Sequence, residues 1–470
     1  MGFLEGIENV NSAVNNFMWG PIMLVLMVGT GIYLSARTGF FQVTRIGTWF
    51  RETLGSLGKK KNKTKDKGAV SPFAALSTAL ASTIGVGNIA GVATAIVSGG
   101  PGSIFWMWVS ALFGMMTKYS EIVLAMHFRK RNKKGEWVGG PMYYIEKGLH
   151  CKWLAVLFAV FALIASFGIG NMSQSNTIAG ALQSSFGLPP WVSGVGVALI
   201  VAAVILGGLN RISKVTSFVV PFMGFFYLLG GLIIIFTNWQ HIGPAFASIF
   251  EGAFSMKAVG GGVLGYAMFS AMRFGVARGV FSNEAGLGSA PIVHAAADND
   301  HPAKQGMWGI FEVFADTILV CTITALVILV SGKLGTVGLD GKVLDGAALS
   351  SAAFESGFPG FGQYFVSISI FFFAVSTLLG WSYYGEKSLE YLCRDGKSGK
   401  SSIIYKIVFL GAIVLGATMN LKLVWDISDT FNAMMALPNL IAVIGLSGIV
   451  FKITKDYRKN YRKPRLHSTK

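Results

Sequence analysis

Apolar residues along this chain of 470 residues gather into eleven segments of roughly 20 residues or more, separated by short polar stretches. A helix of about 20 apolar residues crosses the hydrocarbon core of a bilayer, which is about 30 Å thick. The pattern therefore predicts an all-α, polytopic membrane protein with about eleven transmembrane helices. The predicted spans run near residues 15–36, 71–98, 102–127, 153–182, 190–209, 214–237, 258–292, 305–331, 361–385, 402–420 and 427–452.

The second of these spans is interrupted by small and polar residues. Its centre, Ala81 to Gly91, reads ASTIGVGNIAG. Each Gly costs a helix interior about 1 kcal/mol relative to Ala, and backbone released at membrane depth survives only where it is buried in protein or lines a cavity. A Gly-rich helix that packs closely against its neighbours is the alternative. The combination of Gly85, Gly87 and Asn88 nevertheless favours a binding site at a broken helix, as in secondary transporters.

Composition supports a membrane protein and argues against a nucleic-acid partner. Hydrophobic residues make up 53% of the chain and charged residues only 13%, whereas soluble domains carry about 25% charged residues. The net charge of +17 lies mainly in short loops between apolar segments. It therefore indicates membrane topology rather than nucleic-acid binding.

The distribution of Lys and Arg predicts the orientation. With the N-terminus outside, 32 of the 39 residues lie in cytoplasmic segments, four lie on the outer side and three lie within spans. Cytoplasmic loops carry such an excess, so we expect a multi-pass protein of the plasma membrane with its N-terminus outside and its C-terminus in the cytoplasm. The basic stretch Lys59 to Lys67 is then a cytoplasmic loop, for which contact with anionic lipid is an alternative role.

After the first span, the remaining spans divide into two groups of five. An odd number of spans in each half makes the second half start on the opposite side of the membrane, so the halves form an inverted repeat. The first span of the second half, from Met256 onward, is rich in glycine and is predicted to be broken around Ser270. Arg273, Arg278 and Glu284 are expected near its cytoplasmic end, either as a salt-bridged inner gate or as anchors that snorkel to the interface. The predicted units are 1–70, an N-terminal helix with a basic linker; 71–240 and 241–452, the two repeats; and 453–470, a basic tail.

A broken helix offers two kinds of binding group side by side. The half-helix that begins near Asn88 exposes backbone N–H groups and the positive end of a dipole, which suit a carboxylate. The half-helix that ends near Thr83 exposes carbonyl oxygens, which suit a small cation. The break is therefore predicted to hold a zwitterion and a cation together.

The fourth span adds polar groups to the predicted site. Helical spacing places Phe167, Asn171, Gln174 and Ile178 on one face. A buried amide needs a hydrogen-bond partner, so Gln174 is predicted to donate to a substrate carboxylate. An interhelical hydrogen bond is the alternative, and the role of Asn171 stays open.

In the ninth span, Ser376 and Thr377 precede Trp381 by about one helical turn. Two hydroxyls together with carbonyls from the first break would form a neutral, all-oxygen site suited to Na⁺, and Trp381 would wall a small pocket. Ser and Thr hydroxyls also bond back to the preceding turn, which is the alternative interpretation.

The choice of coupling ion depends on titratable groups near the site. A proton-coupled transporter needs such a group, and neither the break nor the hydroxyl pair contains one, so Na⁺ is favoured and H⁺ stays an alternative. Among the carboxylates within spans, Glu121 is expected to pair with Lys118, whereas Glu312 and Asp316 lack an evident partner.

Three stretches of the chain resemble the alanine or glycine:cation symporter family: ALSTALASTIGVGNIAGVATAI (Ala75 to Ile96), GGPMYYIEKGL (Gly139 to Leu149) and ARGVFSNEAGLGSAPIVHAAA (Ala277 to Ala297). The resemblance covers nearly the whole chain. It implies an amino acid/polyamine/organocation transporter with a leucine-transporter-like five-plus-five inverted repeat, preceded by one extra helix. It also implies uptake of alanine, glycine or other small neutral amino acids, including D-alanine in some members, coupled to Na⁺ and less often to H⁺.

Carried onto this sequence, the resemblance implies a substrate site and a cation site. The residues of the substrate site would be Thr83, Ile84, Gly85, Gly87 and Asn88 in the break, Gln174 at the charged head, and Phe167, Ser270, Phe274 and Trp381 around the side chain. Na⁺ would sit between the carbonyls of Ala81 and Ile84 and the hydroxyls of Ser376 and Thr377. No cofactor is expected besides Na⁺ as the coupling ion.

Other function classes fit the sequence less well. A channel or a non-transporting sensor on the same scaffold would be expected to show a ring-forming filter or an attached soluble domain, and neither is evident. An intramembrane hydrolase would need a Ser–His pair or metal ligands at membrane depth, yet the chain has no HExxH motif and no P-loop, so we do not expect an enzyme. The expected partners are a small zwitterionic amino acid, Na⁺ and the lipid bilayer, and the sequence leaves the oligomeric state open.

Overall fold

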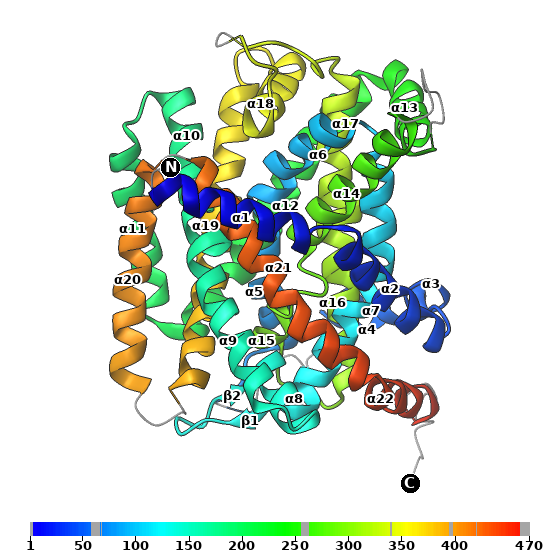
Figure 1. Cartoon of the computed structure of the whole chain (residues 1–470), viewed down its shortest axis with the longest axis vertical. Helices are drawn as coiled ribbons and strands as arrows, with labels where there is room; N and C mark the ends of the chain where they lie inside the picture. Colours follow the sequence, from blue (N-terminus) through cyan, green and yellow to red (C-terminus); the bar gives the residue numbers. More distant parts are fainter. Residues whose placement is uncertain are drawn as a thin grey trace.

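Figure 1 shows the computed structural model, which describes residues 3–57, 66, 68–254, 263–338, 341–393, 398–419 and 421–460. These residues are helical almost throughout. Two short strands, β1 (Lys130–Arg131) and β2 (Trp137–Val138), form an antiparallel hairpin in which Lys130 lies opposite Val138. The predicted class, an all-helical polytopic membrane protein, is confirmed.

The helices of the first half include two π-helical turns, η3 and η4, that continue directly into α-helices. In chain order they are α1 (Phe3–Met18), α2 (Pro21–Arg37), α3 (Phe41–Thr44), α4 (Ile46–Glu52), η1 (Leu54–Ser56), α5 (Pro72–Thr83), η3 (Gly87–Gly91), α6 (Val92–Gly99), α7 (Ser103–Phe128), α8 (Pro141–Gly148), α9 (Lys152–Phe167), η4 (Gly168–Met172), α10 (Ser173–Phe186), α11 (Pro190–Ile205) and α12 (Gly208–Thr237).

The second half contains a third π-helical segment, η6. Its helices are η5 (Trp239–His241), α13 (Ile242–Phe254), α14 (Val263–Asn283), α15 (Ala290–His294), α16 (Pro302–Val313), η6 (Phe314–Cys321), α17 (Thr322–Val330), α18 (Gly346–Gly357), α19 (Gly362–Leu392), α20 (Ser398–Thr418), α21 (Leu421–Gly445) and α22 (Ser447–Asn460).

Each predicted span coincides, in its described part, with one helix or with consecutive helices. Among the described residues, six helices are long and apolar enough to cross a membrane, and eight if each of two bent pairs counts as one span. The bent pairs are Pro72–Thr83 with Gly87–Gly99, at 52°, and Ser428–Gly445 with Ser447–Asn460, at 59°. The larger number of spans inferred from the apolar segments stays a prediction.

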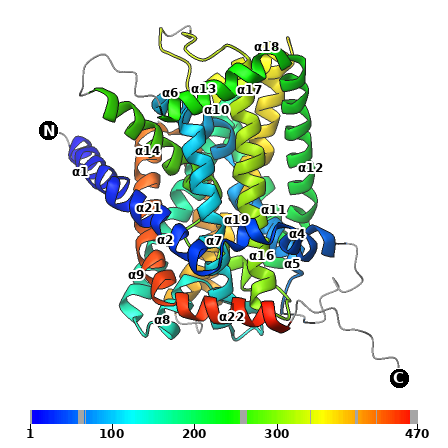
Figure 2. The ribbon, with the colours of Figure 1, turned by 90° about the vertical axis from the view of Figure 1, so that its right-hand side faces the viewer.

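Segments that are predicted to lie on the cytoplasmic side of the membrane are found together at one end of the molecule. Figures 1 and 2 place α8 and the basic helix α22 at this end, and α18 at the opposite end. The N-terminal helices run obliquely across one face, where α1 packs on α21 and α2 packs on α7. Most of the basic linker, the glycine-rich residues 255–262 and the tail 461–470 lie outside the described residues.

The second broken span is interrupted at a different place from the predicted one. Helix α14 continues through Ser270 to Asn283, and the chain leaves the helix only between Glu284 and Ser289. The glycines within α14 serve close packing on α7, because a Cβ at Gly275 would lie 2.2 Å from the Ser103 carbonyl oxygen. Since lipid offers no hydrophobic force between helices, small residues at such contacts let the helices associate. The prediction of a break around Ser270 is therefore wrong.

Candidate substrate and cation site

The first broken span is interrupted where the sequence predicts. Helix α5 begins with Ser71, which accepts a hydrogen bond from the Ala74 N–H, and it ends at Thr83. The chain then turns through Gly85, and the second part of the span starts with the π-helical turn η3. A Cβ at Gly85 would lie 2.5 Å from Thr377 Oγ1, so only glycine lets this turn approach α19 so closely.

Side chains satisfy the backbone groups that this break releases. The Gly85 N–H donates to Asn88 Oδ1 at 2.9 Å, and the Val86 N–H donates to Gln174 Oε1 at 3.4 Å. On the other side of the break, Thr324 Oγ1 donates to the Asn88 carbonyl at 2.7 Å. Because membrane-embedded backbone has no water to bind, these partners explain how an unwound segment persists here.

The two broken spans meet at a small closed cavity of about 10 Å³, which is about the space that one water molecule needs. Phe281 and Glu284 of the second broken span line this cavity. Phe281 packs against Gly87 of the first broken span, since a Cβ added at Gly87 would lie 3.2 Å from the Phe281 ring. The residues that line the cavity are Ser82, Thr83, Gly85, Gly87, Ile169, Gln174, Phe281, Glu284, Thr377 and Trp381. The structure thus brings together six of the predicted site residues: Thr83, Gly85, Gly87, Gln174, Thr377 and Trp381.

Other predicted substrate residues lie outside this cavity. Asn88 is buried, but its amide faces Asp316, and Ile84 is buried at the end of α5. Phe167 stacks edge-on against Tyr405 with ring centroids 5.5 Å apart. Ser270 Oγ donates to the Ser98 carbonyl, and Phe274 lines a separate cavity beside Trp19 and Arg273. Their proposed contacts with a substrate stay predictions.

Two of the four predicted cation ligands, Ala81 and Ser376, contact each other between α5 and α19. Ser376 Oγ lies 3.2 Å from the Ala81 carbonyl oxygen and 2.8 Å from the Phe373 carbonyl oxygen. Thr377 Oγ1 donates to the same Phe373 carbonyl at 3.0 Å. Both hydroxyls therefore bond back to the preceding turn, as the alternative interpretation holds, yet Ser376 also faces the broken helix. These are neutral oxygen ligands of the kind that suit Na⁺.

Glu284 is a cavity residue that the sequence reasoning did not place in the site. Its backbone has φ = +56°, a left-handed conformation that residues other than Gly rarely adopt, and its side chain is buried. The available signal was the pair of glycines that follows it, since Gly286 and Gly288 also have positive φ. Three such residues within five positions mark the true interruption of this span.

The buried charges pair differently from the prediction. Lys118 Nζ lies 3.1 Å from Glu312 Oε1, and His294 Nε2 lies 3.2 Å from Glu312 Oε2. Glu121 instead accepts a hydrogen bond from Asn439 at 2.5 Å. The predicted Lys118–Glu121 pair is therefore wrong, because the nearest carboxylate to Lys118 comes from another helix. Glu312 has clear partners, contrary to the prediction.

Asp316 also has partners that the sequence did not reveal. Its carboxylate accepts hydrogen bonds from Asn88 Nδ2 at 2.7 Å, Thr317 Oγ1 at 2.8 Å and Ser282 Oγ at 3.0 Å. The π-helical segment η6 carries Asp316, and such widened turns occur frequently at functional sites. This carboxylate ties η6 to both broken spans.

Comparison with known proteins decides the family. The sequence model of the sodium:alanine symporter family matches residues 4–470 of this chain. The chain belongs to the sodium:alanine symporter family. The sodium/alanine symporter AgcS of Methanococcus maripaludis is 50% identical over 467 residues, which cover 98% of this chain and 100% of that protein. This is a family of transporters, so the expected family is confirmed and the chain is not an enzyme.

Two relatives from Bacillus subtilis show the breadth of the sodium:alanine symporter family. The amino-acid carrier protein AlsT is 38% identical over 459 residues, covering 97% of this chain and 93% of that protein. The probable sodium/glutamine symporter GlnT is 38% identical over 457 residues, covering 96% and 91%. Glutamine, which is larger than alanine, is thus named for one of these relatives.

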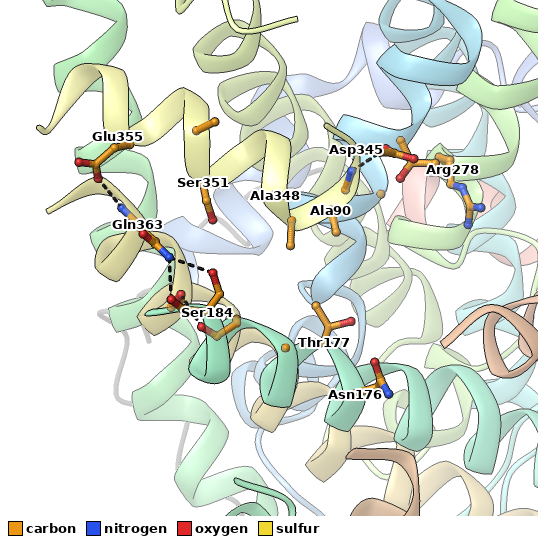
Figure 3. Close-up of a pocket in the computed structure, with 18 of the residues that line it drawn as sticks. Ala90, Asn176, Thr177, Ser184, Arg278, Asp345, Ala348, Ser351, Glu355 and Gln363 are labelled. Atoms are coloured by element: carbon orange, nitrogen blue, oxygen red, sulfur yellow. Dashed lines mark hydrogen bonds between the residues drawn. The ribbon is translucent and has the colours of Figure 1, made fainter. Parts of the chain in front are cut away.

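This member of the sodium:alanine symporter family also has a second, open cavity of about 720 Å³, which Figure 3 shows. We call it the vestibule; it is lined mainly by α10 and α18, together with η3 and α6. Three elements reach both cavities at positions about one helical turn apart, a rise of about 5.4 Å. The pairs, with the closed-cavity residue first, are Gly87 and Ala90, Gln174 and Thr177, and Phe281 and Arg278.

An ion pair lies in the wall of the vestibule. Arg278 Nη1 of α14 is 3.2 Å from Asp429 Oδ2 of α21. Figure 3 shows Arg278 on the side of the vestibule where Asp345 precedes α18. Arg278 therefore lines the same cavity as α18, and its expected position near the cytoplasmic end stays a prediction.

Proposed function

We propose that this protein imports small neutral amino acids, alanine or glycine in the first place and D-alanine as a further candidate, together with Na⁺. The observation that carries the proposal is the meeting of two broken spans at one closed cavity that Gln174, Thr377 and Trp381 also line. Interrupted helices at membrane depth supply exposed helix ends for anionic groups and for small cations. The 50% identity to a sodium/alanine symporter supports the same assignment.

The substrate would occupy the closed cavity. Its carboxylate would face the break around Gly85, Gly87 and Asn88 and the Gln174 amide, and its side chain would point toward Trp381. Because the cavity has room for about one water molecule, the site must widen before it takes even alanine. A small pocket discriminates weakly against one extra methylene, by about 1–3 kcal/mol, and more strongly against long side chains.

Na⁺ would bind between the carbonyl oxygens of Ala81 and Ile84 and the hydroxyls of Ser376 and Thr377. The contact between Ser376 Oγ and the Ala81 oxygen supports this position, since it already brings two of the four ligands within 3.2 Å. A cation at this point would bridge α5 to α19. Substrate and ion would then stabilise the same arrangement of the broken span, which couples their binding.

Access would alternate between the two ends of the molecule. The vestibule would form the outer pathway, separated from the site by one helical turn of three elements, with the N-terminus outside and α8 and α22 at the cytoplasmic face of the plasma membrane. We infer a leucine-transporter-like inverted repeat in which α5–α6 and α14–α15 are the equivalent broken spans. Rocking of one group of helices against another around the fixed site would then switch access.

Uptake into proteoliposomes tests the proposal and its alternatives. We expect an inward Na⁺ gradient to drive accumulation of L-alanine and a proton gradient in Na⁺-free medium to drive little. Equal accumulation with the proton gradient alone would favour H⁺ coupling. Binding of alanine without accumulation under either gradient would favour a non-transporting sensor.

A further inference from the structure

The Glu284 carboxyl group is buried in the wall of the closed cavity. It is 1% exposed, and among the described residues no Lys, Arg or His nitrogen lies within 4 Å of it. Lys118, the nearest candidate in the same region, is 3.1 Å from Glu312. Burying a carboxylate without a cation at ion-pair distance costs free energy, so a cation that enters the cavity would stabilise the charged form of Glu284.

Both carboxylate oxygens keep room for such a partner. Oε1 accepts a hydrogen bond from Trp381 Nε1 at 2.9 Å, and Oε2 accepts one from Ser289 Oγ. An ionised carboxylate has about four lone-pair sites, so two neutral donors leave acceptor capacity for a further donor. Trp381 itself lines the cavity, which places the carboxylate beside the space that a ligand would fill.

The backbone holds Glu284 in position before any ligand arrives. Asn439 Nδ2 donates to the Gly286 carbonyl at 2.8 Å, and the Ala285 N–H donates to Asn283 Oδ1 at 2.9 Å. Together with the left-handed conformation of Glu284, these bonds fix a turn that a free chain would adopt rarely. Backbone strain of this kind is found at active sites and ligand-binding sites, and here it presents a buried carboxyl group to a cavity.

We propose that Glu284 binds the α-ammonium group of the substrate. The inference rests on the proposed function of the cavity and adds the group that recognises the amine. In an α-amino acid the two charged groups flank one carbon atom, so a single small cavity can serve both of them. The helix break and Gln174 would then receive the carboxylate, and Glu284 would make the site selective for substrates that carry a free amine.

The test compares E284Q with wild-type protein in detergent, since Gln keeps the shape of Glu and removes its charge. We expect the Kd for L-alanine in Na⁺ to rise by roughly 10- to 100-fold, the usual effect of losing a charged hydrogen bond. Na⁺ binding without substrate, measured as a Na⁺-dependent shift in thermal unfolding, should stay unchanged. E386Q is the matched control, because Glu386 pairs with Lys406 at 3.3 Å away from the cavity, and its Kd should equal that of wild type.

Three outcomes are decisive for Glu284. Unchanged alanine affinity in E284Q would overturn the inference, and loss of Na⁺ binding would overturn it in favour of Glu284 as a cation ligand. If E284Q does not fold, E284D keeps the charge but shortens its reach, and an affinity equal to wild type would count against the inference. Failure of wild-type protein to bind any amino acid would instead defeat the proposed function.

Discussion

Asn88 Nδ2 donates a hydrogen bond to Asp316 Oδ1 at 2.7 Å, and the two residues are 228 positions apart. The same Asn88 side chain accepts from the Gly85 N–H at 2.9 Å. One amide therefore holds the unwound turn of the first broken span against η6. The shape of the candidate site depends on a contact between the two halves of the chain.

Replacing Asn88 by Ala should weaken both folding and binding. The Gly85 N–H and the Asp316 carboxylate would each lose a buried partner, and an unsatisfied buried polar group costs about 1–3 kcal/mol. We expect a lower midpoint of thermal unfolding in detergent and an L-alanine Kd raised by roughly tenfold or more. N210A, at an exposed asparagine, is the control. A midpoint and Kd equal to wild type would contradict the role assigned to Asn88.

The G85A variant tests how closely the break must approach α19. The added Cβ would lie 2.5 Å from Thr377 Oγ1, and overpacking of this kind costs about 1–3 kcal/mol. We expect alanine uptake to fall by roughly 10- to 100-fold. G91A in the same span is the matched control, because a Cβ there meets no atom within 4 Å. Similar uptake by both variants would show that the approach of Gly85 to α19 is not required.

Ser376 offers a direct test of the cation site. Loss of one Na⁺ ligand in S376A should raise the Na⁺ concentration for half-maximal uptake by about tenfold, equivalent to about 1.4 kcal/mol. The maximal rate at saturating Na⁺ should change little. S369A removes a hydroxyl that donates to the Phe365 carbonyl, at 2.8 Å, on the same helix, and should leave the Na⁺ dependence unaltered. An unchanged Na⁺ dependence in S376A would exclude Ser376 as a ligand.

The ion pair between Arg278 and Asp429 predicts an effect on access. Either D429N or R278Q should change the initial rate of uptake several-fold, because each removes one charge of this partly buried ion pair. The exchange R278D/D429R should recover part of the rate. The initial rates would be measured in proteoliposomes with matched protein content, and wild-type rates in both single variants would contradict an effect of this ion pair on access.

Much of the fold was predictable because apolar periodicity and glycine position act locally. The interruption at Ala81–Gly91 lies where its glycines and Asn88 predict, and Ser376 lies against the Ala81 carbonyl as expected. The second interruption could not be located in this way. Glycines at 275 and 279 look like helix breakers in sequence, yet they allow α14 to pack against α7, so the break falls at Glu284–Ser289.

The pairing of the buried charges could not be predicted from the sequence either. Lys118 and Glu121 are spaced for contact on one helix, but Lys118 pairs with Glu312 of α16 across the core. A pairing between helices depends on their packing, which local spacing does not contain. For the same reason Glu284 was placed near the end of a span, whereas the structure places it in the wall of the cavity.

Reciprocal binding of alanine and Na⁺ tests the central claim most directly. Calorimetric titration of purified protein with L-alanine, in Na⁺ and in choline of equal ionic strength, gives the coupling factor between the two ligands. We predict that Na⁺ tightens alanine binding by roughly tenfold or more, and that alanine tightens Na⁺ binding by the same factor, as linkage requires. Equal alanine affinity in Na⁺ and in choline would contradict a shared substrate and cation site at the broken helix.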